Sequence, residues 1–304
     1  MRNRLFPISQ TNDPCADPEW NNCLLTDRKT SSTQSSSFTN CNFSSCNNKK
    51  NSPQGHGGAI SYSVANGKLT VTLCYFYNCI AYQKEGGAID ARNADDVTVT
   101  LSAFVKCHAD SIGDHASGGG GINLRSIQSQ PYLKLCSFIS CTSSDDGGGV
   151  AIWSSKATNT LFCSECRYVL CSTPNSNPNQ ISPYAGGIIL WNNNNILKCS
   201  NILFASNTGW LGGAYATCNV TLAPNYILSF SFFNNNTGTC GNDATFYSFL
   251  PDNEHQAFLH CFSTTPSNRI GYLNNTWQTT KVDWLPLGCI YFEDSSYIID
   301  IRNF

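Results

Sequence analysis

The sequence predicts an all-β fold: a single-stranded, right-handed parallel β-helix of about seven coils with a cap at each end. An aromatic residue is followed three positions later by Cys or Asn seven times along the chain. A Gly-Gly pair comes after each of the first six of these units, and the segments between them alternate apolar and polar residues. A repeat with a period of about 30 residues is typical of a stack of like units and not of a globule around one core.

The two parts of each repeat differ in how constant their lengths are. The aromatic residues are Phe43, Phe76, Phe104, Phe138, Tyr168, Phe204 and Phe233, and the glycine pairs begin at Gly57, Gly86, Gly119, Gly147, Gly186 and Gly212. From each glycine pair to the next aromatic residue there are 18 to 21 residues, whereas from each aromatic residue to its own glycine pair there are 8 to 18. We therefore expect stacked strands in the first part and projecting loops in the second, at 47–56, 109–117 and 172–185.

The part of constant length has the composition of β-strands. Lys68–Leu73 and Asp96–Leu101 alternate apolar and polar residues, and β-branched residues are frequent in them. No segment has the pattern of a long amphipathic helix. Equivalent strands of successive coils would lie about 4.8 Å apart, so the seven aromatic side chains are expected to form one ladder inside the coil. Parallel crossovers of this kind are right-handed almost without exception.

The repeats divide the chain into three parts. Residues 36–250 carry the repeats and are expected to form the β-helix. Residues 1–35 contain no full repeat and are expected to be an N-terminal cap or a disordered segment. Residues 251–304 lose the period and are expected to be a C-terminal cap, because the open strand edges at the end of a solenoid must be covered.

Composition argues against two classes of partner. Only 12% of the 304 residues are charged and the net charge is −2, so nothing suggests nucleic-acid binding. No apolar run approaches the roughly 18 residues that span a bilayer, so no membrane-spanning segment is expected. The first nine residues lack the apolar region of a secretory signal, and residue patterns alone therefore leave the localisation open.

Cysteine usage favours an oxidising setting. The chain has 17 cysteines, and Asn-x-Ser/Thr sequons occur at Asn42, Asn219, Asn235 and Asn274. Two interpretations of the repeat cysteines stay open. Cys79 with Cys107, and Cys141 with Cys171, would lie within the Cα distance window of a disulfide if they stack, or the thiols are buried small hydrophobic groups.

We favour buried thiols with at most a few cross-links, because Asn207 and Asn236 occupy the same repeat position. Cys163-Ser-Glu-Cys166 is a lone CxxC without a second pair at finger spacing, and we expect it to be structural. No metal or cofactor is expected.

The alternation of Gly-Gly-Ala-Ile (Gly57–Ile60, Gly86–Ile89) with Phe-x-x-Asn (Phe204–Asn207, Phe233–Asn236) resembles the repeats of the chlamydial polymorphic membrane proteins. The variant Cys-x-Phe-x-x-Cys at Cys41–Cys46 is similar to related β-helix proteins of trichomonad parasites. The resemblance covers about residues 36–250. It implies a pectin-lyase-like fold on a cell surface or outside the cell, used in adhesion or antigenic display through a protein or glycan partner.

A polysaccharide-active enzyme of the pectate lyase or polygalacturonase type is the alternative. Gly55-His56-Gly57 is similar to a polygalacturonase motif, but the aspartate pairs Asp95–Asp96 and Asp145–Asp146 follow it instead of preceding it. His56 is therefore expected to be an exposed loop residue.

Arg92 and Arg125 fall at one repeat position, and Asp90 and Asn123 at another. We expect the next coils to place Trp153 and Asn192 at the Arg position, and Ala151 and Leu190 at the Asp position. Such a patch is two coils deep and is expected to be a solvated face. The sequence thus favours a non-catalytic repeat scaffold with no catalytic residues.

Overall fold

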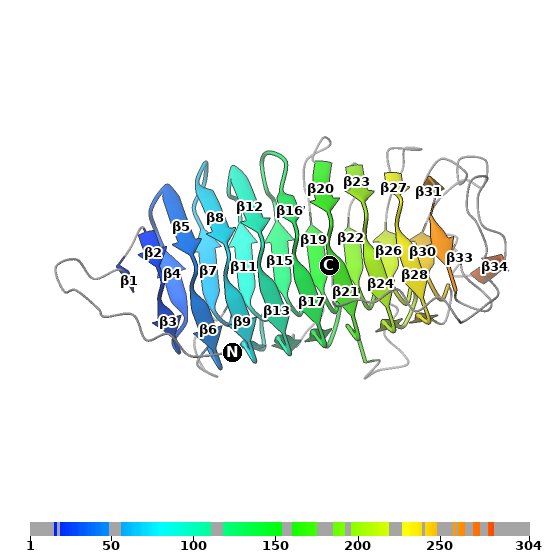
Figure 1. Cartoon of the computed structure of the whole chain (residues 1–304), viewed down its shortest axis with the longest axis horizontal. Helices are drawn as coiled ribbons and strands as arrows, with labels where there is room; N and C mark the ends of the chain where they lie inside the picture. The colour runs from blue at the N-terminus through cyan, green and yellow to red at the C-terminus, as the bar shows by residue number, and fades with distance from the viewer. Residues whose placement is uncertain are drawn as a thin grey trace, which may run out of the picture.

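The computed structural model describes residues 15–16, 19–48, 56–110, 118–153, 160–174, 185–191, 196–218, 227–238, 241–247, 258–259, 261–264, 270–273 and 279–282. All regular elements of these residues are β-strands. The strands stack into a rod, so that each coil of chain lies beside the next along the long axis (Figure 1). The predicted all-β parallel solenoid is confirmed.

Three long parallel sheets form the walls of the rod. Sheet 1 contains β1 (Cys15–Ala16), β2 (Glu19–Asn21), β5 (Ser35–Thr39), β8 (Lys68–Thr72), β12 (Asp96–Thr100), β16 (Tyr132–Lys134), β20 (Thr160–Ser164), β23 (Ile196–Ser200), β27 (Ile227–Ser229) and β31 (Phe258–Leu259). Sheet 2 contains β3 (Leu24–Leu25), β6 (Asn42–Ser44), β9 (Tyr75–Tyr77), β13 (Ala103–Val105), β17 (Ser137–Ile139), β21 (Arg167–Val169), β24 (Leu203–Ala205), β28 (Phe232–Asn234) and β32 (Phe262–Ser263).

Sheet 3 contains β4 (Lys29–Ser31), β7 (Ile60–Ser63), β11 (Ile89–Arg92), β15 (Ile122–Arg125), β19 (Val150–Trp153), β22 (Ile188–Trp191), β26 (Tyr215–Cys218), β30 (Ala244–Tyr247), β33 (Ile270–Leu273) and β34 (Thr279–Val282). Between sheets 2 and 3 lie two small parallel sheets, β10 (Ile80–Tyr82) with β14 (His108–Asp110) and β18 (Thr142–Ser143), and β25 (Thr208–Gly209) with β29 (Thr237–Gly238).

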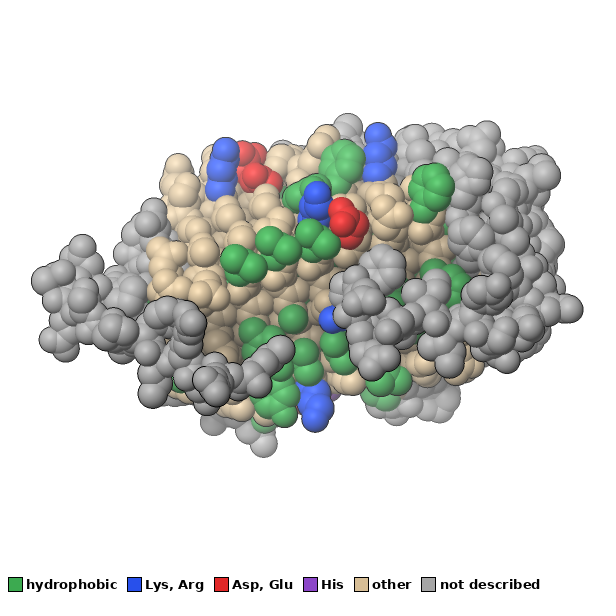
Figure 2. All heavy atoms as spheres, in the orientation of Figure 1, with side chains coloured by type: hydrophobic (Ala, Val, Ile, Leu, Met, Phe, Trp, Pro, Cys, Tyr) green, Lys and Arg blue, Asp and Glu red, His purple; other side chains and the backbone are tan. Residues whose placement is uncertain are grey.

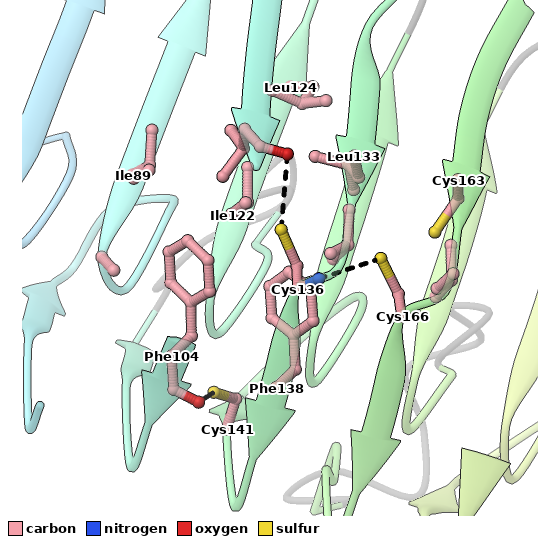
Figure 3. Packing of buried hydrophobic residues seen from close by; sticks show 14 of the residues in the cluster. Ile89, Phe104, Ile122, Leu124, Leu133, Cys136, Phe138, Cys141, Cys163 and Cys166 are labelled. Carbon is pink, nitrogen blue, oxygen red and sulfur yellow. Dashed lines mark hydrogen bonds between the residues drawn. The ribbon is translucent and has the colours of Figure 1, made fainter. Parts of the chain in front are cut away.

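The aromatic ladder fills the interior as predicted. Rings of successive coils stack with centroids 4.6 to 5.2 Å apart. The register of sheet 2 places Phe104 beside Phe76 on one side and Phe138 on the other. All seven rings are buried, and Figure 3 shows Phe104 and Phe138 within the surrounding cluster of apolar side chains. Burial of a continuous apolar column, one strand spacing per coil, is the main force that holds the coils together.

The side chain three positions after each aromatic residue donates a hydrogen bond to a backbone carbonyl of the preceding coil. The thiol of Cys141 donates to the carbonyl of Phe104 at 3.3 Å (Figure 3), and the thiol of Cys171 donates to that of Phe138 at 3.4 Å. Cys79 and Cys107 make the same bond at 3.8 and 3.7 Å. These thiols are free and buried, which confirms the preferred interpretation of the repeat cysteines.

Other cysteines follow the same pattern of burial. The free cysteines of the described residues are all buried, including Cys163 and Cys166 of the CxxC, and Cys23 is disulfide-bonded. The Sγ of Cys166 accepts a hydrogen bond from the backbone N–H of Cys136 (Figure 3). The CxxC is therefore part of the core, as predicted.

The glycine pairs allow neighbouring coils to approach closely. Gly86 has a φ of +71°, a conformation that glycine adopts without cost. A Cβ atom added to Gly87 would lie 2.0 Å from the carbonyl oxygen of Gly120 in the next coil, so no larger residue fits there.

One glycine pair lies one residue out of the expected register. Gly147 is paired with Ala185, and Val150 with Ile188. Gly186–Gly187 is thus equivalent to Gly148–Gly149, because Ala185 takes the place of the first glycine. The register expected for this coil from the glycine pairs is therefore wrong by one position.

Parallel pairing extends beyond residues 36–250 on both sides. β2, β3 and β4 pair with β5, β6 and β7, and β31, β32 and β33 continue the three sheets at the other end. The two antiparallel pairs within the described residues are β1 with β2 and β33 with β34, one at each end of the rod. Most of each predicted loop (49–55, 111–117 and 175–184) lies outside the described residues.

Candidate binding site on the outer face of sheet 3

Sheet 3 presents two columns of outward side chains. The register aligns Arg92 with Arg125, then Trp153, then Trp191. The second column runs from Asp90 through Asn123 to Ala151 and Ile189. The expectation that Asn192 and Leu190 continue these columns is wrong, because of the one-residue shift at Ala185. The first column is thus two arginines followed by two tryptophans.

A third column, which the sequence analysis missed, borders this face. It consists of the residue just before each glycine pair: His56, Glu85, Gly118 and Asp146. The backbone places them in line, since Gly57 N–H donates to the carbonyl of Glu85 and Gly147 N–H donates to the carbonyl of Gly118. Their fixed position before the glycine pair is the sequence signal that could have revealed them.

Glu85 is the centre of a buried charged network. Its side chain is 6% exposed, and it accepts hydrogen bonds from Arg92, from Asn123 Nδ2 at 3.1 Å and from Arg125 Nη1 at 3.2 Å. Asp90, 1% exposed, accepts from Arg92 Nε and Asn123 Nδ2, both at 2.7 Å. Two carboxylates and two guanidinium groups from neighbouring coils therefore neutralise one another, as buried charges require.

His56 lies in this network and is half-buried, so the expectation of an exposed loop residue is wrong. Its Nδ1 is hydrogen-bonded to Arg92 Nη2, and its carbonyl accepts from Arg28 at 3.2 Å. Burial, with the positive charges of Arg92 and its neighbours, lowers the pKa of His56 from 6.5 to about 3. The imidazole is therefore neutral at physiological pH, and its Nδ1 accepts a hydrogen bond from Arg92.

The pKa of Asp90 is shifted in the opposite direction. Burial raises it from 3.8 to about 6; the charge of Glu85 adds to the rise, and Arg92 opposes it. The predicted solvated face is thus corrected: the Arg92 side chain is only 18% exposed, whereas that of Arg125 is 42% exposed. Arg92 is held inside by the carboxylate of Asp90, whose repeat position was predicted correctly, and by that of Glu85, which the sequence had not singled out.

His56, Glu85 and Asp90 each offer a ligand atom within 4.8 Å of the others. The Arg92 guanidinium lies between them and bonds to all three. It supplies the positive charge that a metal ion would bring to such a group. This cluster is the one set of three potential metal ligands among the described parts of the chain.

Asp146 organises the tryptophan end of the face. Its carboxylate accepts hydrogen bonds from the indole N–H of Trp153 at 3.2 Å, from that of Trp191 at 3.0 Å and from the backbone N–H of Gly118 at 3.0 Å. The two indole rings stack with centroids 4.5 Å apart. Burial and the nearby Asp145 raise the pKa of Asp146 well above its usual range. The carboxylates of Glu85, Asp90 and Asp146 are therefore all engaged in bonds within the rod.

One polar atom of Asn123 is buried without a hydrogen-bond partner. Its Nδ2 is bound to both carboxylates, and its Oδ1, fully buried, has no hydrogen-bond partner. Buried acceptors are almost always satisfied in folded proteins. This atom marks the boundary between the charged half of the face and the aromatic half.

Comparison of the chain with protein-family models, with characterised proteins and with solved structures finds no match. Within the described residues, no helix has the length and hydrophobicity that crossing a bilayer requires.

Proposed function

We propose that this chain is a non-catalytic β-solenoid scaffold for surface display or adhesion. The observation that carries the proposal is the state of the charged network around Glu85. Glu85 and Asp90 are each bound by an arginine and by Asn123 from neighbouring coils. A general acid or base must be within hydrogen-bond reach of a substrate proton. These carboxylates are instead buried, and their hydrogen bonds link neighbouring coils.

The outside of the rod supports the same proposal. Large apolar side chains are exposed in several coils, among them Leu73, Leu101 and Leu135. Figure 2 shows hydrophobic side chains gathered on the face that it draws. A contiguous patch of exposed apolar side chains usually marks a surface that binds another molecule. The partner class, a protein or glycan at a cell surface or in a matrix, and the location of the chain there rest on the resemblance of the repeats.

A binding assay tests the proposal. Purified chain, labelled at its N-terminus, is applied to cultured cells and to matrix-coated surfaces. A matched variant in which residues 175–184 are replaced by a Gly-Ser linker of equal length is run beside it; Thr173 and Ala185, which flank this segment, are buried in the coils and are kept. We expect saturable binding by the first and weaker binding by the second, with unchanged thermal unfolding. The absence of saturable binding to any of these surfaces would contradict the proposal.

One observation favours a polysaccharide-active enzyme as the second candidate. The pKa of Asp90, about 6, is close to the pH at which a general acid works best, and Arg92 lies beside it. Pectic and glycosaminoglycan substrates, followed by uronate absorbance and by reducing ends, test this candidate. Turnover that is lost in the variants Asp90→Asn and Arg92→Lys, but kept in Lys106→Ala on another face, would replace the scaffold proposal.

A further inference from the structure

A row of leucines runs along the corner between sheets 1 and 2. Leu73, Leu101 and Leu135 occupy the same position in three successive coils, since Leu73 N–H bonds the carbonyl of Thr100 and Leu101 N–H bonds that of Lys134. These three residues are called the leucine row. They are 52%, 49% and 41% exposed, and their φ angles are +55°, +51° and +54°.

Leucine is an unfavourable residue at this corner. The left-handed conformation disfavours a side chain with a Cβ, and asparagine tolerates it best after glycine. The chain itself places Asn40 at this corner one coil before the row and Asn201 two coils after it, at φ angles of +51° and +55°. The fold therefore accepts asparagine here. Folding does not require leucine at these three positions. A contact of the half-exposed leucines with another molecule explains their presence better.

The ends of the row are polar. Lys134 and Glu165 lie at one end and form an ion pair with Nζ and Oε1 3.6 Å apart. Asn40 lies at the other end. Tyr75, 40% exposed, lies beside Leu73 on sheet 2. An apolar centre with a polar rim is the anatomy of a protein–protein contact.

We propose that the leucine row is the contact between two copies of this chain, packed antiparallel about a two-fold axis at Leu101. The aromatic rings of these coils are stacked 4.7 to 4.8 Å apart, so the three leucines are evenly spaced. An evenly spaced row of identical side chains is its own complement under a two-fold rotation. Leu101 then meets Leu101 of the second copy, and Leu73 meets Leu135.

The regular spacing of the three leucines favours a second copy of this chain as the partner. A surface without a repeat near 4.8 Å can meet one or two of the leucines, whereas a second solenoid of the same chain meets all three in register. Lys134 and Glu165 pair at one end of the row. Arg167, whose Nε donates to Ser137 Oγ, lies at the same end. The antiparallel arrangement places these charges at opposite ends of the two copies, so like charges do not meet. Because three leucines and a tyrosine form a contact smaller than the roughly 1,200 Å² of a standard interface, the dimer is weak and depends on concentration.

Sedimentation equilibrium of the full chain tests the proposal. Between about 10 μM and 500 μM we expect the average mass to rise towards that of a dimer, with dissociation in the micromolar range or weaker. The variant with Leu73→Asn, Leu101→Asn and Leu135→Asn should remain monomeric and keep its thermal unfolding transition, because asparagine suits this corner. Leu170→Asn is the matched control: Leu170 is 54% exposed at a φ of +55° but lies at another corner, and its variant should still dimerise.

Cross-linking tests the two-fold axis itself. A short thiol-specific bifunctional reagent should join two copies of the Leu101→Cys variant. The Leu73→Cys and Leu135→Cys variants should be joined to each other in a mixture, and much less to themselves. A monomer at every concentration, a dimer that survives the triple asparagine variant, or cross-linking that ignores this pattern would overturn the proposal. So would a monomer that binds lipid vesicles or another protein through the row. None of these outcomes depends on adhesion to cells.

Discussion

The side chain of Asn207 donates a hydrogen bond from Nδ2 to the backbone carbonyl of Tyr168, 3.0 Å away in the preceding coil. Earlier coils place a cysteine at this position, and its thiol bonds the equivalent carbonyl. Cysteine and asparagine are thus interchangeable donors in one column of this solenoid. Asn207 also accepts a bond from the N–H of Cys171 through its Oδ1 at 2.9 Å, which a thiol does less well.

Replacement of Cys141 by asparagine should be tolerated. The amide restores the bond to the carbonyl of Phe104 and fills a similar volume, so we expect the free energy of unfolding to change by less than about 1 kcal/mol. Cys141→Ala removes the donor and leaves a small cavity, and it should lower the stability by about 1–2 kcal/mol. Urea unfolding of both variants measures the difference. Equal loss in both would show that the hydrogen bond contributes nothing.

Replacement of Phe138 by alanine should lower the free energy of unfolding by about 3–5 kcal/mol. The ring is fully buried between Phe104 and Tyr168, with centroids 4.8 and 4.7 Å away, and the rigid sheets limit collapse around the cavity. Phe138→Leu retains most of the volume and should cost about 1–2 kcal/mol. Chemical denaturation of the two variants measures both losses in the free energy of unfolding. A loss below 1 kcal/mol for alanine would contradict the central role of the ladder.

The thiols should resist alkylation in the folded protein. Twelve cysteines of the described residues are free and buried, and burial keeps the reagent from them. We expect mass spectrometry to show these sites unmodified under native conditions and fully modified in denaturant without reductant. Sites that stay unmodified in denaturant until a reductant is added are disulfides, and their presence at most of these positions would contradict the structure.

The stability of the protein should depend on pH through two groups that act in opposite directions. The pKa of His56 is about 3 when folded and 6.5 unfolded, so the unfolded chain binds the extra proton between these values and stability rises with pH there. The pKa of Asp90 is about 6 when folded and 3.8 unfolded, so the folded chain binds the extra proton and stability falls as pH rises.

Variants separate these two effects. Between about pH 4 and 6, Asp90→Asn should make stability rise more steeply with pH, and His56→Gln should make it rise less or fall. Urea unfolding at several pH values in this window measures the slopes. The same slope in both variants and in the parent would mean that neither group changes its protonation on unfolding.

Removal of the Asp146 carboxylate should destabilise the tryptophan half of sheet 3. Asp146→Ala leaves two indole N–H groups and the N–H of Gly118 without their acceptor, which we expect to cost about 2–4 kcal/mol. Tryptophan fluorescence should shift to longer wavelength as water reaches the rings. Asp145→Ala, next to it in sequence, is the matched control and should change the fluorescence little.

The sequence by itself determined the architecture. The spacing of Phe-x-x-Cys/Asn units, the alternating strands and the glycine pairs predict parallel coils and one aromatic ladder, because a period-two pattern and a constant repeat length leave one way to stack Phe104 on Phe138. That the repeat cysteines need no disulfide followed from Asn207 and Asn236 at the same position.

The tertiary structure alone decided the candidate site and the outer surface. The register at Ala185 placed Trp191, and not Asn192, beside Trp153, because a glycine pair can shift by one residue without disturbing the sequence pattern. Glu85, His56 and Arg92 met through three-dimensional stacking of residues up to 36 positions apart. The sequence pattern also did not show that Leu101 is exposed at a positive φ, because by its pattern Leu101 is the last apolar residue of an alternating strand. Pattern reasoning follows a strand's period, and corners, where that period stops, are set by how the coils pack.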